Sequence, residues 1–142
     1  MKKYILPTLI VILIATTAIY FFNENKTRTL EKNIFQTDNL SEEINKISVF
    51  DNSTTNGKSI NKENPSFMPL LTLLTDMEFK KSNSKFNYSD GYDLMTNHNE
   101  NFYSIQITEN GLLNIDGETY KIQNNETVKE LFNIFKRVPN KN

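Results

Sequence analysis

Cysteine and tryptophan are absent from this sequence of 142 residues, and histidine occurs only once. Without cysteine there is no disulfide framework, no thiolate nucleophile, no zinc site built on cysteine and no lipid attached through a cysteine. A single histidine excludes a metal site built on several histidines. We therefore expect neither a bound metal nor a cofactor.

Glycine is scarce and the charges nearly cancel. The sequence has four glycines, and its 16 Lys and Arg against 17 Asp and Glu give a formal net charge of −1. Four glycines leave almost no room for a phosphate-binding loop. A general nucleic-acid-binding protein would carry a basic excess, so we expect no nucleic-acid partner. With no Gly-x-Ser-x-Gly elbow either, the sequence favours a protein that is not an enzyme.

The most informative feature is an apolar run near the start of the chain. Residues 4–22 contain no charged side chain and follow Lys2 and Lys3. At ~1.5 Å per residue, a helix over this run is about 28 Å long, close to the ~30 Å hydrocarbon core of a bilayer. Pro7 falls in the first turn, where a helix tolerates proline. We predict a transmembrane anchor over residues 4–22, with the lipid bilayer as its direct partner and residues 1–3 as a cytoplasmic tail.

A cleaved signal peptide is the alternative interpretation of this run. Such a peptide has an apolar region of about 7–15 residues followed by small residues at the cleavage site. Thr16, Thr17 and Ala18 form a poor site of that kind, and the apolar run continues beyond them to Phe22. An uncleaved anchor is therefore the favoured reading. A buried core helix is the third possibility.

The orientation of the anchor rests on a nearly balanced count of basic residues. Lys2, Lys3 and the terminal amine precede the run, while Lys26, Arg28 and Lys32 follow it. The Lys-Lys opening is typical of a secretory start. We predict a single-pass protein of the cell membrane with its amino end in the cytoplasm and its bulk outside, and a cytoplasm-facing domain remains the alternative.

Beyond the anchor we predict a polar stalk over residues 23–42 and an α+β domain over residues 43–138. Ile47 and Val49 alternate with polar neighbours, which indicates a strand, and Asn56-Gly57 is typical of a hairpin turn. The leucine-rich pattern of residues 70–77 predicts a helix, with Ser66 as its cap and Pro69 in its first turn.

The second half of the domain predicts an antiparallel meander followed by a helix. Strand-like alternation from residue 92 to residue 122 is interrupted at Asn110-Gly111 and Asp116-Gly117, which are tight-turn dipeptides. A final helix begins at Asn124 or Asn125, and Pro139 ends it before a short tail, residues 139–142. The expected fold is a small antiparallel sheet packed with two helices.

Few residues suggest a site. The single His98 stands in a polar stretch and is interpreted as a solvated turn residue. Residues 97–108 resemble the opening of a calcium loop but lack its glycine and its final glutamate. Strand aromatics usually fill a core, yet aromatics are also frequent at interfaces. Tyr88, Asp90 and Tyr92, beside the predicted turn at Gly91, are therefore the candidate partner-binding residues.

Lys2-Lys3, the run to Phe22, the helix over residues 70–77 and the stretch 110–122 carry a resemblance. Together they resemble uncharacterised membrane-anchored extracytoplasmic proteins of low-GC Gram-positive bacteria. That resemblance implies no catalytic residues. The expected function is a non-enzymatic surface module or accessory subunit that binds a ligand, or another membrane or surface protein. An immunity factor acting at the membrane against a toxin is the alternative, and a hydrolase using His98 and Asp93 is a third.

Overall fold

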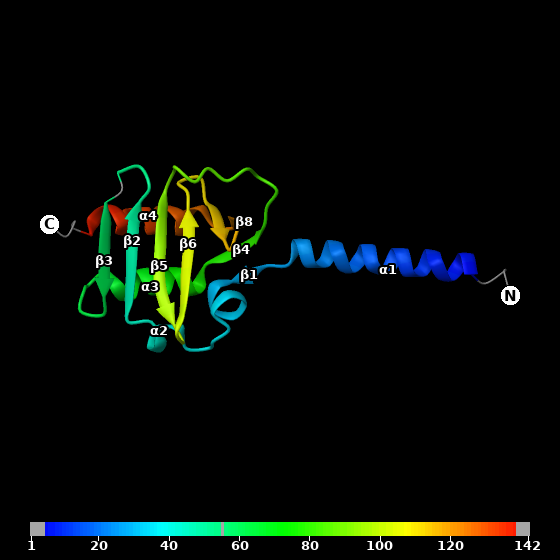
Figure 1. The fold of residues 1–142 in the computed structure, drawn as a ribbon, viewed down its shortest axis with the longest axis horizontal. Coiled ribbons are helices and arrows are strands. Elements are labelled where there is room, and N and C mark those ends of the chain that lie inside the picture. Colours follow the sequence, from blue (N-terminus) through cyan, green and yellow to red (C-terminus); the bar gives the residue numbers. More distant parts are fainter. Residues whose placement is uncertain (1–4, 55, 139–142) are drawn as a thin grey trace.

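The computed structural model describes residues 5–54 and 56–138 (Figure 1). The predicted tails, residues 1–3 and 139–142, and the helix-ending Pro139 lie outside the described residues. Along the chain the elements are α1 (Ile5–Asn25), β1 (Arg28–Thr29), the π-helical turn η2 (Glu31–Phe35), α2 (Leu40–Glu43), β2 (Lys46–Asp51), β3 (Gly57–Asn61), α3 (Phe67–Asp76), β4 (Glu78–Lys81), β5 (Tyr92–His98), β6 (Asn101–Ile107), β7 (Leu112–Ile115), β8 (Glu118–Ile122) and α4 (Asn125–Arg137).

All strands join one antiparallel sheet in the order β1-β4-β8-β7-β6-β5-β2-β3. The predicted α+β fold is confirmed, and β5 to β8 form the predicted meander. The sheet is larger than the small one expected, because the β2–β3 hairpin adds to β5 and β4 adds to β8. The returning strand of the predicted hairpin is β3, which buries only Ile60. Strand β4 also buries a single side chain, Phe79, so its alternating pattern is too short to predict a strand.

The two predicted helices, α3 and α4, cover one face of the sheet (Figure 1). Helix α3 buries Phe67 and three leucines, and α4 buries Val128, Leu131, Phe132 and Phe135. The Asn124 side chain caps α4 by accepting a hydrogen bond from the Glu126 amide at 2.9 Å. Ser66 occupies the N-cap position of α3, but its side chain makes no capping hydrogen bond. The 3.6-residue apolar period thus located both helices correctly.

Backbone conformation explains two tight turns of the meander. Asp116 and Gly117 both have positive φ, 52° and 83°, as a two-residue hairpin turn with this twist requires. Asn99 and Glu100 adopt the same region, at 46° and 66°, between β5 and β6. Both turns lie where the sequence predicts them.

The predicted Asn56-Gly57 turn is wrong in its placement. Gly57 is the first residue of β3 and pairs with Phe50, and the connection from β2 precedes it. A Cβ atom on Gly57 would lie 2.5 Å from the Phe50 ring. The glycine is therefore needed because an aromatic ring lies over it, and not because the chain turns there.

Residues 28–44, called the connecting segment below, differ from the predicted stalk. Leu30, Phe35, Leu40 and Ile44 are all buried, with exposed fractions of 0–5%. They belong to the same core cluster as α3, α4 and the inner sheet residues. Two short helical turns, η2 and then α2, place these widely spaced apolar residues on the side that faces the core. The folded domain therefore begins near residue 28, well before the expected residue 43.

Leu30→Ala tests this assignment. Leu30 is fully buried, so its truncation should lower the free energy of unfolding by about 2–5 kcal/mol. The exposed Lys32→Ala, two residues away, should change it by less than about 0.5 kcal/mol. The measurement is urea unfolding of the full chain in detergent. Equal stability of the two variants would mean that the segment is a stalk after all.

Candidate functional site

The sheet has one covered face and one partly open face. Figure 1 shows the strands β2, β5 and β6 lying in front of α3 and α4, with their other face uncovered. The open face ends at β7, where Leu112 and Asn114 point away from the main core and are nevertheless 6% exposed. On the β7 side the open area therefore stops at β6, and on the other side it continues over β5 and β2 to the edge strand β3.

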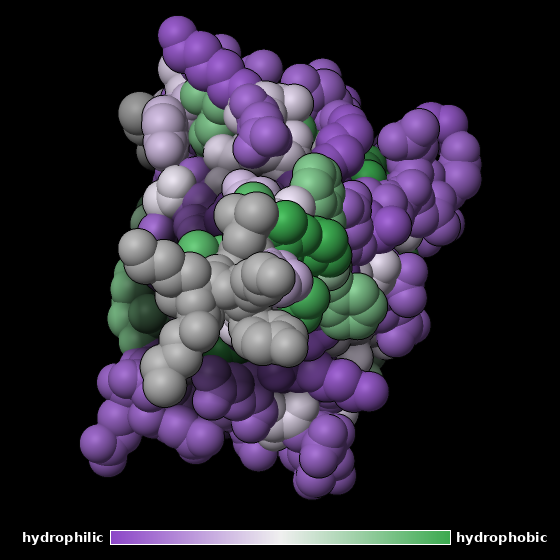
Figure 2. Space-filling model, turned by 90° about the vertical axis from the view of Figure 1, so that its right-hand side faces the viewer, coloured by the Kyte–Doolittle hydropathy of each residue, from purple (hydrophilic) through white to green (hydrophobic). Residues whose placement is uncertain are grey.

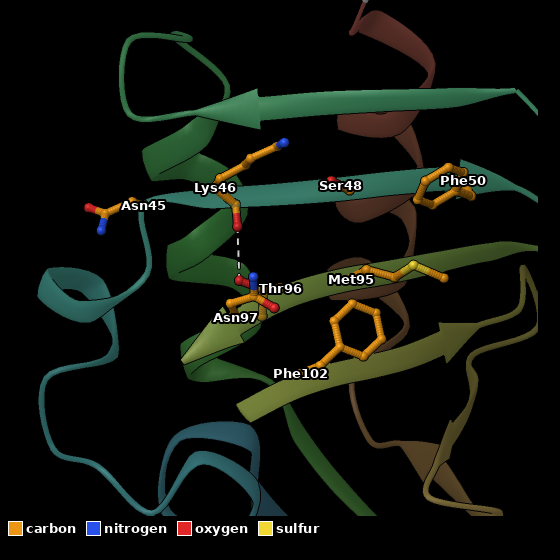
Figure 3. Close-up of a pocket in the computed structure, with 8 residues that line it drawn as sticks. All are labelled: Asn45, Lys46, Ser48, Phe50, Met95, Thr96, Asn97 and Phe102. Atoms are coloured by element: carbon orange, nitrogen blue, oxygen red, sulfur yellow. Dashed lines mark hydrogen bonds between the residues drawn. The ribbon is translucent and has the colours of Figure 1, made fainter. Parts of the chain in front are cut away.

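Three apolar side chains lie on this open area, one each from β2, β5 and β6 (Figure 3). Phe50 and Phe102 are 36% and 64% exposed, and Met95 is half-buried between them. We call Phe50, Met95 and Phe102 the outer patch. They line a shallow groove of about 370 Å³ together with polar residues, which are Asn45, Lys46, Ser48, Thr96 and Asn97.

The chemistry of the outer patch suits recognition more than reaction. Lys46 is the single ionisable side chain in the groove lining. Aromatic and methionine side chains are over-represented at protein interfaces, and contiguous apolar exposure on a soluble surface generally marks one. Within residues 5–54 and 56–138, no three His, Cys, Asp or Glu side chains gather closely enough to hold a metal ion.

Sequence reasoning missed the outer patch, although a signal for it exists. In β2 the buried residues are Ile47 and Val49, and Phe50 breaks their alternation. In β6 the core residues are Ile105 and Ile107, in phase with Tyr103, and Phe102 again falls on the opposite face. An aromatic residue that lies between the alternating buried residues of its strand, and not among them, therefore indicates the open face.

The structure does not gather the three candidate partner-binding residues. Tyr88 is 58% exposed and stacks edge-on against Phe86 with ring centroids 5.1 Å apart. Asp90 is also exposed. Tyr92 instead points into the core, where its ring lies 4.8 Å from that of Phe135, and burial raises the pKa of its hydroxyl. Tyr92 is thus a core residue, and only Tyr88 and Asp90 reach the surface.

His98 is buried and not solvated as expected. It is the last residue of β5, its side chain is 2% exposed, and its Nε2 contacts the Glu43 carboxylate. Nδ1 is buried without a hydrogen-bond partner. The contact of Nε2 with Glu43 joins the end of α2 to β5.

A polar junction fixes α1 to the domain. Lys81 of β4 forms ion pairs with Glu24 of α1 at 3.5 Å and with Glu118 of β8 at 3.3 Å. Glu118 also accepts a 2.7 Å hydrogen bond from the Tyr120 hydroxyl, and this hydrogen bond, ahead of the contact with Lys81, lowers the pKa of Glu118. Burial, together with this hydrogen bond, raises the pKa of Tyr120 to about 12. Only Lys26 and Thr27 separate α1 from β1.

The domain surface around this junction is hydrophilic. Arg28 donates to the Asn23 carbonyl at the end of α1, at 3.0 Å, and its guanidinium lies 5.7 Å from the centre of the Tyr120 ring. Figure 2 looks along α1 and shows the helix emerging from a domain surface that is mainly hydrophilic. The apolar helix and the polar domain surface therefore meet abruptly.

Glu43→Gln is predicted to reduce the acid sensitivity of the fold. The hydrogen bond from His98 holds the pKa of Glu43 below its ordinary value of 4.5. This contribution to stability is therefore full above pH 4.5 and is lost as the pH falls through the lower folded value. The variant should show a smaller drop in unfolding temperature in acid, measured by circular dichroism of the full chain between about pH 3 and pH 7.

The neighbouring Glu42→Gln is the matched control and should keep the acid sensitivity of the unaltered protein. Part of that sensitivity persists in both variants, because hydrogen bonds also lower the pKa of Asp51 and of Glu118. An unchanged profile for Glu43→Gln would show that the His98 contact does not stabilise the charged form of Glu43.

Comparison with protein-family models found no match. Comparisons with curated proteins and with solved structures found none either.

Proposed function

We propose that this protein is a non-enzymatic, membrane-anchored module that binds another protein through the outer patch. In this proposal α1 crosses the membrane and the folded domain, from about residue 28 to residue 138, stands on its extracytoplasmic side. The observation that carries the proposal is the outer patch. On this uncovered sheet face, Phe50 and Phe102 expose apolar surface to water. Burying that surface in an interface is favourable.

The anchor has independent support. The α1 helix is long and apolar enough to cross a membrane. Its side chains from residue 9 to residue 22 are exposed and pack against nothing in the domain, with Leu13 68% and Phe22 77% exposed. A helix that is apolar all round and packed against no other part of its chain is stable in lipid and not in water. A signal sequence near the amino end has the same features, so its retention is tested directly.

The first test concerns anchoring and orientation. A chain tagged after residue 142 should stay in the membrane pellet after alkaline washing. The tag should also be digested when protease is added to intact cells. Substituting Ile12→Lys together with Ala15→Lys places two charges mid-helix, at about 3 kcal/mol each, and should release the chain. Soluble unaltered protein would exclude the anchor, and a tag protected until the membrane is opened would place the domain in the cytoplasm.

The second test concerns binding through the outer patch. A photoreactive benzoylphenylalanine at position 102 preserves an aromatic side chain on the exposed site. The same group at position 129, on α4 and on the opposite side of the sheet, is the matched control. Illumination of native membranes should give a discrete crosslinked adduct from position 102 that position 129 does not give. Equal backgrounds from both positions would contradict a binding role for the outer patch.

A further inference from the structure

We propose that the protein bound at the outer patch is a second copy of this chain, anchored in the same membrane. The inference rests on the proposed function, because it uses α1 as a membrane anchor. Two observations point to a second copy as the partner. They are the distribution of charge on the open face and the direction in which α1 leaves the domain. The result is a symmetric dimer in which two open sheet faces pack together.

The charges on the open face are few and lie at opposite ends. Alternation along β2, β5 and β6 places nine residues outward, and just two of them are charged, Lys46 and Asp93. Strand register puts Asp93 beside Phe50, at one end of the patch. Lys46 lies at the other end of β2, beside Asn97 (Figure 3). The nine outward residues are Lys46, Ser48, Phe50, Asp93, Met95, Asn97, Phe102, Ser104 and Gln106.

The apolar side chains cross this face along a diagonal. Phe50 pairs with Asp93 at one end, Met95 pairs with Ser48 in the middle, and Phe102 pairs with Asn97 at the other end. Met95 is therefore at the centre, with Lys46 and Asp93 displaced toward opposite ends. The apolar diagonal provides the surface that an interface would bury. The two charges determine how the two copies are oriented relative to each other.

The anchor determines how two copies can meet. The α1 helix runs crosswise to the strands and roughly within the plane of the sheet (Figure 1). The Lys81–Glu24 ion pair, the Arg28 hydrogen bond to Asn23 and the two-residue link to β1 connect the end of α1 to the domain in this orientation. With α1 along the membrane normal, the open face stands upright on the membrane and faces sideways. A second anchored molecule can therefore approach it by lateral diffusion.

Membrane anchoring also selects the symmetry axis. Two copies inserted in the same direction can form a twofold interface only about an axis along the membrane normal. That axis lies in the sheet plane and crosses the strands, so it reverses the strand direction of the facing copy. Lys46 of each copy then faces the end of the other that carries Phe50 and Asp93, and Met95 faces Met95. A twofold axis parallel to the strands would place both Lys46 side chains at the same end of the interface and point the two anchors in opposite directions.

The packing is compatible with two sheets stacked face to face. Such sheets lie ~10 Å apart with interdigitating side chains. The groove of about 370 Å³ beside Phe50, Met95 and Phe102 provides space for the facing aromatic rings. The Phe50 ring lies flat over Gly57, so it leaves the face shallow.

Cysteine crosslinking tests the dimer without background, since the natural chain has no cysteine. In the full chain in membranes, Met95→Cys places a thiol next to the symmetry axis. Facing sheets ~10 Å apart are too distant for a direct disulfide, so a short bis-maleimide should join the two thiols into a covalent dimer. Lys129→Cys, exposed on α4, is the matched control and should stay monomeric. Maleimide labelling of both variants and their circular dichroism verify that each thiol is accessible and each chain folded. A folded, labelled Met95→Cys variant with no more dimer than the control would overturn the proposal.

Charge reversal then tests the register. In the Met95→Cys background, Lys46→Glu should lower the dimer yield about fivefold, because the twofold axis duplicates the Lys46–Asp93 pair and two exposed ion pairs are lost. Asp93→Lys should do the same, and the double reversal Lys46→Glu with Asp93→Lys should restore the yield. Asp93 also accepts a 3.0 Å hydrogen bond from Asn52, so the restoration by the double variant is the decisive readout. Additive losses in the double variant would overturn the reversed-strand arrangement.

The photocrosslink at position 102 separates this inference from the proposed function. An adduct of two copies supports both. An adduct with a different protein, and no Met95→Cys dimer, overturns the second copy as partner while the binding module stands. The absence of any adduct, together with the absence of a crosslinked Met95→Cys dimer, overturns both.

Discussion

One-sided burial of the sheet is the constraint on which the rest of this structure depends. Helices α3 and α4 both lie on the same face, so alternate residues of every long strand must supply the core. Ile47, Leu94 and Ile105 meet this requirement on three neighbouring strands. The residues between them face outward, and no helix shields them. The outer patch exists because two phenylalanines and a methionine occupy those outward positions.

The same core accounts for the connecting segment. The core would be open at the end of the sheet near α2 without Leu30, Phe35, Leu40 and Ile44, all of which are buried in it. The His98–Glu43 contact and the T-shaped contact of the Phe35 and His98 rings, 5.7 Å apart, join this segment to β5. A stretch that is polar by composition therefore belongs to the fold through a few apolar residues. Each of these residues is fixed by a short turn of helix.

The parts of the fold that were predictable are those with a local signal. A 3.6-residue apolar period located α3 and α4, and period-two alternation with Asp116-Gly117 located the meander. The pairing of β4 with β8 depends on residues about forty positions apart, and no pattern within either strand indicates it. The connecting segment was missed because its buried residues, Leu30, Phe35, Leu40 and Ile44, are spaced by five, five and four. Successive steps of five leave the single face of a regular helix, so no periodic pattern indicates their burial.

The candidate site was predictable in type but not in place. Aromatics as interface residues were expected, yet Tyr92 is in phase with the core residue Leu94 and is buried with it. Phe50 and Phe102 are out of phase with their strands, which is a stronger indication of exposure than proximity to a turn. His98 was misplaced for a related reason. Its polar neighbours suggested solvent, while its phase in β5, shared with Leu94, places it in the core.

The two residues between α1 and β1 limit where the domain can act. Lys26 and Thr27 together extend at most about 7 Å, and the ion pair of Glu24 with Lys81 shortens the usable length further. With α1 in a bilayer, the domain cannot search the space above the membrane as a tethered receptor on a long linker does. Its encounters are confined to a thin layer at the lipid surface. Its effective concentration toward any partner is therefore set by the number of molecules per unit membrane area, and not by the bulk concentration in solution.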